Sequence, residues 1–289
     1  MNVLEETKYL MKKYNIKANK NLGQNFLVDE GVIEDIIQGA DIGENDLVIE
    51  IGPGIGTMTK YLLEKAKKVI CIEIDKKMIK ILKDRFVAYN NLIIINEDVL
   101  KIDLNKIICE QKLIDNISNT KIIANLPYYI TTPIIMKLLE NKLEINDITV
   151  MIQKEVADRL IEIPGGKNTG AITYTVFYYT EPEKIREVEN KAFIPMPEVT
   201  SEIIKLKLRK EPVVNVKDVN IFFRLIKSAY MQRRKTLINS LVNAGVFKNK
   251  NEAQDIFKMI NFSENVRAEN LTIDDFALLT NTYIKCILE

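Results

Sequence analysis

The spacing of hydrophobic residues divides this chain into three parts. Between residues 46 and 152, short apolar runs alternate with stretches of helical spacing, and the runs lie at 47–51, 69–74, 92–96, 121–125 and 148–152. Helical spacing is clear at 57–65 and 76–85. Strands that are apolar on both faces and separated by helices predict a mostly parallel sheet covered on both sides. We therefore expect an α/β domain.

The pattern changes beyond residue 154. We predict helices at 155–161 and 171–178, then an antiparallel pair of strands near 184–189 and 201–209. From residue 219 the apolar spacing is helical to the end, which predicts a small all-helical domain. The segment at 17–25 is polar and basic, typical of an arm that orders over a ligand. The predicted organisation is an arm at 1–28, an α/β domain at 29–210 and a helical domain at 211–289.

Composition narrows the class of protein. The chain has 47% hydrophobic and 28% charged residues, an ordinary balance for a soluble globular protein. Charges interrupt every apolar run well before the roughly 20 residues that span a bilayer, and the first residues lack a secretory pattern. We expect a cytoplasmic protein without membrane contact. Three scattered cysteines and the absence of histidine argue against a disulfide framework and a metal site.

The charge distribution is more informative than the net charge of +1. Residues 205–258 contain thirteen basic and four acidic side chains, a net charge of +9, which leaves −8 for the rest. A basic segment of this kind favours contact with nucleic-acid phosphates. A solvated helical face is an equally good explanation of the segment taken alone.

Carboxylates and glycines at predicted strand ends indicate a nucleoside cofactor. The first strand enters the turn Glu50-Ile-Gly52-Pro-Gly54-Ile-Gly56, whose glycines let the backbone approach a ligand closely. Because Pro53 interrupts the glycines, we expect a cofactor without phosphates. Glu73 can accept hydrogen bonds from both ribose hydroxyls, and Asp98 from an adenine amino group. Each feature alone fits a structural role as well, and the turn combined with Glu73 is much more specific.

The sharpest signal is Asn125-Leu126-Pro127-Tyr128, after the fourth strand. The lone pair of an adenine N6 is delocalised into the ring, so this nitrogen is a poor nucleophile. The Asn125 side-chain oxygen and the Leu126 carbonyl can accept from its two N–H groups and draw it toward a tetrahedral geometry. Pro127 fixes the turn and Tyr128 can stack on the base. The alternative is a structural turn with a packed tyrosine.

These motifs resemble the N6-adenine branch of class I methyltransferases. Three further stretches narrow the resemblance, namely Leu22-Gly-Gln-Asn-Phe-Leu27, Phe193-Ile-Pro-Met-Pro-Glu-Val199 and Arg233-Arg-Lys-Thr-Leu237. Nearly end to end, the chain resembles the bacterial small-subunit rRNA dimethyladenosine transferases, whose loss confers kasugamycin resistance. Many members carry asparagine and serine after the tyrosine, where this chain has Tyr129-Ile-Thr131. This departure bears on the shape of the target-base pocket.

The resemblance implies a Rossmann-like fold with a mostly parallel seven-stranded sheet, a small all-α C-terminal domain, and S-adenosylmethionine as cofactor. In the cofactor site it implies Asn25 and Leu27 from the arm, Gly52 and Gly54 from the turn, Glu73 at the ribose, Asp98 at the adenine, and Asn125. The implied catalytic residues are Asn125, Leu126, Pro127, Tyr128 and Phe193, with Phe193 stacking on the target base opposite Tyr128. Arg233, Arg234 and Lys235 are the best candidates to grip RNA phosphates.

The implied reaction is in-line methyl transfer to N6 of two adjacent adenosines in a hairpin loop near the 3′ end of 16S rRNA, during small-subunit biogenesis. It needs no strong base, which fits a chain without histidine. We expect a monomer, since no dimer element is evident. Three alternatives stay open: a 23S rRNA adenine dimethyltransferase of the macrolide-resistance type, a non-catalytic assembly or transcription factor, and a small-molecule or protein methyltransferase. The first is disfavoured by the stretches 22–27 and 233–237, and the second by the intact 125–128 motif. The third is disfavoured by the basic segment at 205–258.

Overall fold

The computed structural model describes residues 1–19 and 22–288, which form two packing units. Unit 1 comprises Met1–Ala157 and Pro182–Leu208, and unit 2 comprises Asp158–Glu181 and Arg209–Glu289. No helix in the described part of the chain is long and apolar enough to cross a membrane.

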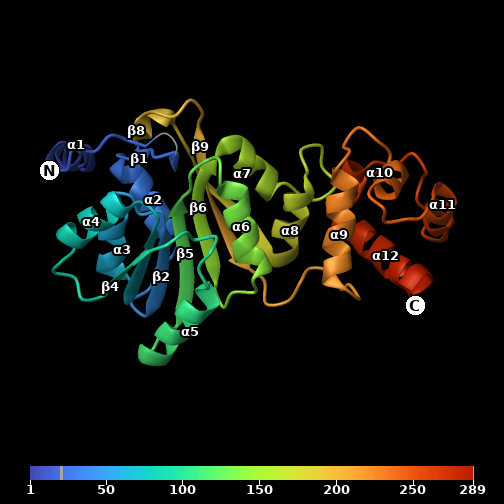
Figure 1. Ribbon diagram of the computed structural model, residues 1–289, viewed down its shortest axis with the longest axis horizontal. Coiled ribbons are helices and arrows are strands. Elements are labelled where there is room, and N and C mark those ends of the chain that lie inside the picture. Colours follow the sequence, from blue (N-terminus) through green and yellow to red (C-terminus); the bar gives the residue numbers. More distant parts are fainter. Residues whose placement is uncertain (20–21, 289) are drawn as a thin grey trace. The chain divides into compact units, whose positions relative to one another are not determined.

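A seven-stranded sheet forms the centre of unit 1, and its strand order is β4-β3-β2-β5-β6-β9-β7 (Figure 1). The strands are β2 (Asp46–Ile51), β3 (Lys68–Glu73), β4 (Leu92–Asn96), β5 (Asn119–Asn125), β6 (Asp147–Gln153), β7 (Thr180–Val188) and β9 (Ser201–Leu208). Strands β2 to β6 run parallel to one another, and β9 is antiparallel to β6. This confirms the predicted mostly parallel, seven-stranded sheet.

Helices cover both faces of this sheet. Buried residues of α2 (Glu30–Gly39), α3 (Thr59–Lys65) and α4 (Lys76–Arg85) share one apolar cluster with Val48, Ile123 and Met151 of the strands. Helices α5 (Leu104–Ile114) and α6 (Thr131–Glu140) lie over the opposite face (Figure 1). Because strand side chains alternate between faces, every second residue meets one of these two layers. Helix α7 (Lys154–Ile161) follows directly after β6.

The N-terminal segment contains a helix that the sequence analysis did not predict. Within the predicted arm, α1 (Val3–Lys13) begins at a capping box in which Asn2 and Glu5 satisfy each other's backbone N–H groups. Val3 and Leu10 are buried, and Glu6 pairs with Arg85 of α4 at 2.6 Å. The amino end of the chain is therefore a packed part of unit 1.

Further along, β1 (Phe26–Leu27) pairs antiparallel with β8 (Phe193–Ile194), which follows the 3-10 turn Asn190–Ala192. This small sheet fastens the predicted arm to a segment far away in the sequence. Lys20 and Asn21, which the arm prediction also included, lie outside the described residues.

Unit 2 is helical and has its own core. It contains α8 (Ala171–Tyr179), α9 (Val219–Tyr230), α10 (Leu237–Asn243), α11 (Lys250–Met259), α12 (Ile273–Tyr283), the 3-10 turn Ala268–Asn270 and a final π-helical turn at Ile284–Leu288. The sequence analysis placed 158–181 with the sheet, whereas the structure packs it with the C-terminal helices. The reason is aromatic burial: Tyr174 contacts Phe276, and Tyr178 contacts Phe222 and Phe223, at centroid distances of 5.0 to 5.4 Å.

Candidate active site

A cavity of about 300 Å³ opens at the carboxyl ends of β2, β3 and β5. The chain runs from β2 outward to β3 and β4 and then returns to place β5 on the other side of β2. Such a switch point leaves a crevice beyond the strand ends, where open α/β sheets bind ligands. The sequence-predicted residues that line the cavity are Asn25, Leu27, Gly52, Gly54, Glu73, Asp98, Asn125, Leu126, Pro127 and Tyr128.

The glycine turn after β2 forms one wall. Gly52, Gly54 and Gly56 have φ angles of +69°, +57° and +81°, in the left-handed region that favours glycine. A Cβ on Gly52 would meet no atom within 4 Å, so this position faces open space, whereas a Cβ on Gly56 would lie 2.5 Å from Phe86. The first glycine thus leaves the cavity clear, and the third allows close packing against α4.

Glu73, the last residue of β3, is 6% exposed and already oriented. One carboxylate oxygen accepts a hydrogen bond from the Gly54 N–H at 3.1 Å, and the other accepts from the Asp75 N–H at 2.8 Å. Burial raises the pKa of Glu73, and the backbone donors oppose this shift. Each oxygen keeps a lone pair for a further donor, so the carboxylate can hold a pair of hydroxyls.

Asp98 lies two residues beyond β4 and is half-buried. Its Oδ1 accepts from the Leu100 N–H at 2.9 Å, while its backbone oxygen accepts from Lys101 at 2.8 Å and Ile102 at 3.1 Å. Asp98 therefore shapes a turn, which was the alternative to a ligand contact. The two roles are compatible, because the turn contact uses Oδ1 and the side chain still lines the cavity.

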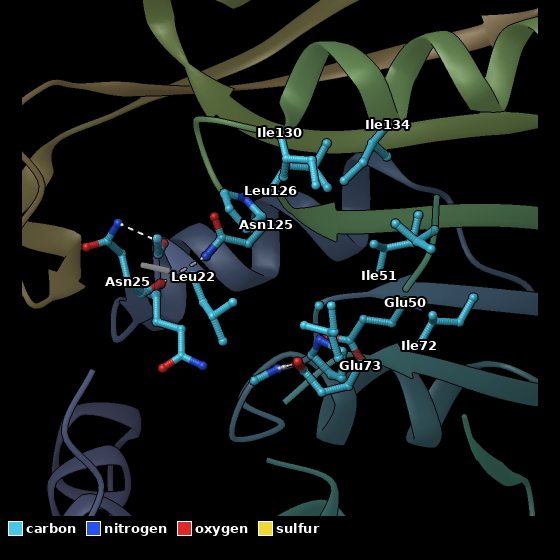
Figure 2. A pocket seen from close by; sticks show the side chains of 18 of the residues that line it. Leu22, Asn25, Glu50, Ile51, Ile72, Glu73, Asn125, Leu126, Ile130 and Ile134 are labelled. Carbon is cyan, nitrogen blue, oxygen red and sulfur yellow. Dashed lines mark hydrogen bonds between the residues drawn. The ribbon is translucent and has the colours of Figure 1, made fainter. Parts of the chain in front are cut away.

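Asn125 ends β5 and points toward the arm (Figure 2). Its Nδ2 donates to the backbone oxygen of Asn25 at 3.1 Å. Only the nitrogen of an amide can donate to a carbonyl, so this contact fixes which way the amide faces. With Nδ2 bonded to the arm, the Asn125 Oδ1 remains available to accept a hydrogen bond from a ligand. The next residue, Leu126, is 1% exposed, and its backbone N–H donates a hydrogen bond to the backbone oxygen of Met151 in β6 at 3.1 Å.

The turn after Asn125 is stabilised by its own hydrogen bonds. The Pro127 carbonyl accepts from the Ile130 N–H and from the Thr131 hydroxyl, each at 3.1 Å. Thr131 is buried and supports the turn, whereas Tyr129 is 61% exposed at the cavity edge. Tyr128 is half-buried, with its hydroxyl 2.8 Å from that of Ser201.

The arm covers the cavity through short polar contacts. Gln24 donates from Nε2 to Asp75 Oδ2 at 3.0 Å, and Asn25 donates from Nδ2 to Gly23 O at 3.3 Å. Leu27 is 5% exposed and adds an apolar contact to the cavity wall. The predicted arm residues therefore lie beside the glycine turn and Asn125.

Phe193 is the exception among the sequence-predicted catalytic residues. It pairs with Leu27 between β8 and β1, is 3% exposed, and packs in the apolar cluster that contains Val32 and Ile36 of α2. It does not line the cavity. In this structure the ring packs in that cluster and its strand pairs with the arm, and the predicted stacking of Phe193 on a base stays a prediction.

The predicted RNA-binding residues lie in unit 2, on the turn between α9 and α10. Arg233, Arg234 and Lys235 are exposed. The Arg233 Nη2 also donates to the backbone oxygen of Thr169 at 3.2 Å, which anchors that side chain within unit 2. Arg234 and Lys235 are thus better suited to an experiment that changes charge alone.

Glu50 lines the cavity although the sequence analysis gave it no role of its own. It is 1% exposed, its Oε2 accepts from the Thr59 hydroxyl at 2.6 Å and from the Cys71 thiol at 3.5 Å, and its Oε1 has no hydrogen-bond partner in the described structure. Burial raises the pKa of Glu50 to about 7. The sequence signal that could have indicated a role for Glu50 is its position as the single acidic residue within the apolar run 47–51.

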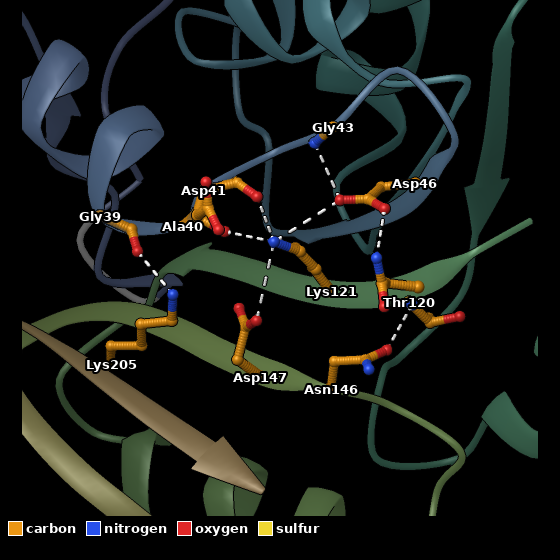
Figure 3. A network of polar contacts seen from close by, with 11 residues as sticks. Gly39, Ala40, Asp41, Gly43, Asp46, Thr120, Lys121, Asn146, Asp147 and Lys205 are labelled. Carbon is orange, nitrogen blue, oxygen red and sulfur yellow. Dashed lines mark hydrogen bonds and ion pairs between the residues drawn. The ribbon is translucent and has the colours of Figure 1, made fainter.

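A buried lysine, Lys121, lies near the amino end of β5, whereas the cavity lies beyond the carboxyl end of this strand; Figure 3 shows the contacts of the lysine. The Lys121 ammonium donates to the backbone oxygens of Ala40, at 2.8 Å, and Asp41, and lies 3.5 Å from Asp46 and 3.8 Å from Asp147. Burial raises the pKa of Asp147, and Lys121 opposes this shift. The cluster ties the amino ends of β2, β5 and β6 together. Among the described residues, no group of His, Cys, Asp and Glu side chains could hold a metal ion.

Comparison with known proteins gives consistent matches. The sequence model of the family described as ribosomal RNA adenine dimethylase matches residues 15–285. A protein from Alkaliphilus oremlandii named ribosomal RNA small subunit methyltransferase A is 45% identical over 281 residues, 97% of each chain. A protein of the same name from Clostridium botulinum (strain Loch Maree) is 47% identical over 95% of this chain and 97% of that one.

Solved structures show the same fold. A dimethyladenosine transferase from Plasmodium falciparum matches with a TM-score of 0.73 and 28% identity, covering 88% of this chain and 95% of that one. The 23S rRNA methyltransferase ErmE matches with a TM-score of 0.67 and 22% identity over 90% and 99% of the two chains, which is a likeness of fold.

Proposed function

The chain belongs to the ribosomal RNA adenine dimethylase family, and on that premise we propose that it transfers methyl groups from S-adenosylmethionine to N6 of two adjacent adenosines in a hairpin loop near the 3′ end of 16S rRNA. The product is N6,N6-dimethyladenosine in a maturing small subunit. Relatives that are 45% to 47% identical, over nearly their whole length, carry the small-subunit name. For the 23S rRNA alternative, the match to ErmE at 22% identity is a likeness of fold.

The observation that carries the proposal is the cavity at the strand ends, in which the glycine turn, Glu73, Asp98 and Asn125 converge. Its residues fit S-adenosylmethionine: the open space beside Gly52 admits the methionine portion, Glu73 would hold the ribose, and Asp98 would accept from the adenine amino group. Asn25 and Leu27 would cover the bound molecule. The cofactor supplies an electrophilic methyl group on a positively charged sulfur.

The residues at 125–128 would position the target amine. The amide orientation set by Asn25 leaves the Asn125 Oδ1 to accept one N6–H, and the Leu126 carbonyl would accept the other. Two acceptors on one amine draw its lone pair out of conjugation and direct it, which is catalysis by alignment and electrostatics. Tyr128 would stack on the flipped base, which must first leave its neighbours. The methylated nitrogen then loses its proton to water.

Transfer of labelled methyl groups tests this proposal directly. Undermethylated small subunits, protein-free 23S rRNA and intact large subunits serve as acceptors, and the modified nucleoside is identified by mass. We expect dimethyladenosine only in the small-subunit RNA. Labelling of 23S rRNA alone would favour the macrolide-resistance activity, and no labelling of either RNA would refute the proposal.

A single substitution tests the role of Asn125. Asn125→Ala removes the Oδ1 acceptor and the contact with the arm, so we expect methyl transfer to fall by at least about 100-fold while the circular dichroism spectrum is unchanged. Asn45→Ala is the matched control, because Asn45 is an exposed asparagine that precedes β2, at the other end of the sheet. Near-normal transfer by Asn125→Ala would refute the assigned role.

The basic turn of unit 2 can be tested separately from the cofactor site. Reversal of Arg234 and Lys235 to glutamate should weaken small-subunit binding at least about tenfold and reduce its salt dependence, because phosphate contacts release counterions. Reversal of Lys80 and Lys83, exposed on α4, changes the net charge equally and serves as the control. S-adenosylmethionine binding should stay constant in both variants. Equal losses for RNA and cofactor would count against an RNA-gripping role.

A further inference from the structure

Two hydroxyl groups meet behind the proposed target pocket. The Tyr128 Oη and the Ser201 Oγ are 2.8 Å apart, and either can be the donor. Ser201 is fully buried and Tyr128 is half-buried. The contact joins residues 73 positions apart, so it is a product of the fold rather than of local sequence.

The topology of the sheet explains why these two groups meet. Strands β5 and β6 are parallel and end at the cavity edge, where Tyr128 follows β5. Strand β9 is antiparallel to β6, with Ser201 opposite Gln153, so β9 begins where the parallel strands end. Ser201 is the first residue of β9 and therefore arrives at the same edge.

The backbone on both sides of the contact is fixed. The Leu126 N–H donates to Met151 O at 3.1 Å, and the Lys154 N–H donates to Thr200 O at 3.1 Å. Leu126, two residues before Tyr128, is thus anchored to β6, and Thr200, the neighbour of Ser201, is anchored to the first residue of α7. The remaining freedom is rotation of the tyrosine side chain, and the hydrogen bond to Ser201 removes it.

A fixed ring matters because a stacking platform works only in one orientation. A tyrosine at a cavity wall can rotate about two bonds, and each rotation tilts the plane on which a base would lie. Misplacement of a bound group by about 1 Å can cost about 100-fold in rate. Burial also raises the pKa of Tyr128, so the phenol stays neutral and able to donate near neutral pH.

We propose that Ser201 is a positioning residue that fixes the ring plane of Tyr128 for stacking on the target adenine. This inference rests on the proposed function, since it assigns Tyr128 to the target base. Ser201 itself is buried behind the tyrosine and acts through it.

A double-mutant cycle tests the inference. Ser201→Ala and Tyr128→Phe each remove one side of the contact, and we expect each to lower kcat for small-subunit methylation about tenfold. The double variant should show about the same tenfold loss, because the contact is already absent in either single variant. The Kd for S-adenosylmethionine and the melting temperature should be close to those of the wild-type chain.

Thr200→Ala is the matched control, because Thr200 is the half-buried neighbour of Ser201, and it should retain wild-type kcat. An unchanged kcat in Ser201→Ala, or a loss of about 100-fold in the double variant, would overturn the inference. These results differ from failure of the proposed function, in which the wild-type chain itself would not methylate small-subunit RNA.

Discussion

Replacement of Glu50 by glutamine should remove a pH-dependent loss of stability from unit 1. Glu50 is 1% exposed beside the cavity, and only its Oε2 is hydrogen-bonded in the described structure, by Thr59 and Cys71. Burial raises its pKa from 4.5 to about 7, while these two donors oppose the shift and the charge of Glu73 adds to it. The folded state therefore holds a proton that the unfolded chain releases at a lower pH.

The magnitude follows from proton linkage. A rise from 4.5 to about 7 corresponds to about 3 kcal/mol, at roughly 1.4 kcal/mol for each pKa unit. This stability is fully present below pH 4.5, the unfolded value, and is lost as the pH rises through about 7, the folded value. Between pH 5 and pH 8, the wild-type free energy of unfolding should fall by about 2–3 kcal/mol relative to that of Glu50→Gln.

Urea unfolding followed by circular dichroism at several pH values measures this difference. The chain has no tryptophan, so circular dichroism is preferable to tryptophan fluorescence. Glutamine introduces a buried amide, which lowers the free energy of unfolding by the same amount at every pH. The test therefore compares how the free energy of unfolding changes with pH in the two proteins, and not its absolute value. Glu64→Gln on α3 is the control, because Glu64 is exposed. Parallel pH profiles for wild-type protein and Glu50→Gln would refute the reasoning.

Three further predictions concern the sheet and the glycine turn. Lys121→Met should lower the free energy of unfolding by about 3–5 kcal/mol at pH 8, because it leaves the buried Asp46 and Asp147 without their cationic partner. The loss should be smaller at pH 5, because burial raises the pKa of Asp147 and its protonation relieves the unpaired charge. Equal losses in urea unfolding at both pH values would contradict this. Gly56→Ala should destabilise the fold strongly, because its Cβ would lie 2.5 Å from Phe86. Gly52→Ala should cost only about 1–2 kcal/mol of stability but weaken S-adenosylmethionine binding measured by calorimetry, since its methyl would enter open space. Equal stability losses and unchanged binding would show that Gly52 does not face the cofactor.

The sequence was sufficient to bring most of the predicted cofactor-binding and catalytic residues together at one cavity. Gly52, Glu73, Asp98 and Asn125 each lie at or just beyond the carboxyl end of a parallel strand. Parallel strands end at a common edge, so their spacing along the chain already implies a shared place in space. The prediction thus needed only the residues at each strand end and the rule that parallel strands end at a common edge.

Contacts between distant segments carried no such signal. Helix α8 has apolar helical spacing, but nothing in it shows that Tyr174 and Tyr178 pack against α9 and α12 instead of the sheet. Helix α1 was missed because its charged residues obscure its two buried apolar positions, Val3 and Leu10, and its third buried residue, Thr7, is polar. In both cases the partner surface decides the outcome, and the partner lies more than 40 residues away in the sequence.

The contacts of Phe193 with the arm are likewise between distant segments, and the sequence did not predict them. They change the interpretation of the segment 193–201. At one end, β8 pairs with β1 and fastens the arm, whose Asn25 carbonyl orients the Asn125 amide. At the other end, Ser201 holds the hydroxyl of Tyr128. The segment therefore supports both halves of the proposed target pocket from behind, one through the arm and one through β9. A substitution that loosens this segment should disturb amine alignment and base stacking together, although none of the side chains from 193 to 201 lines the cavity.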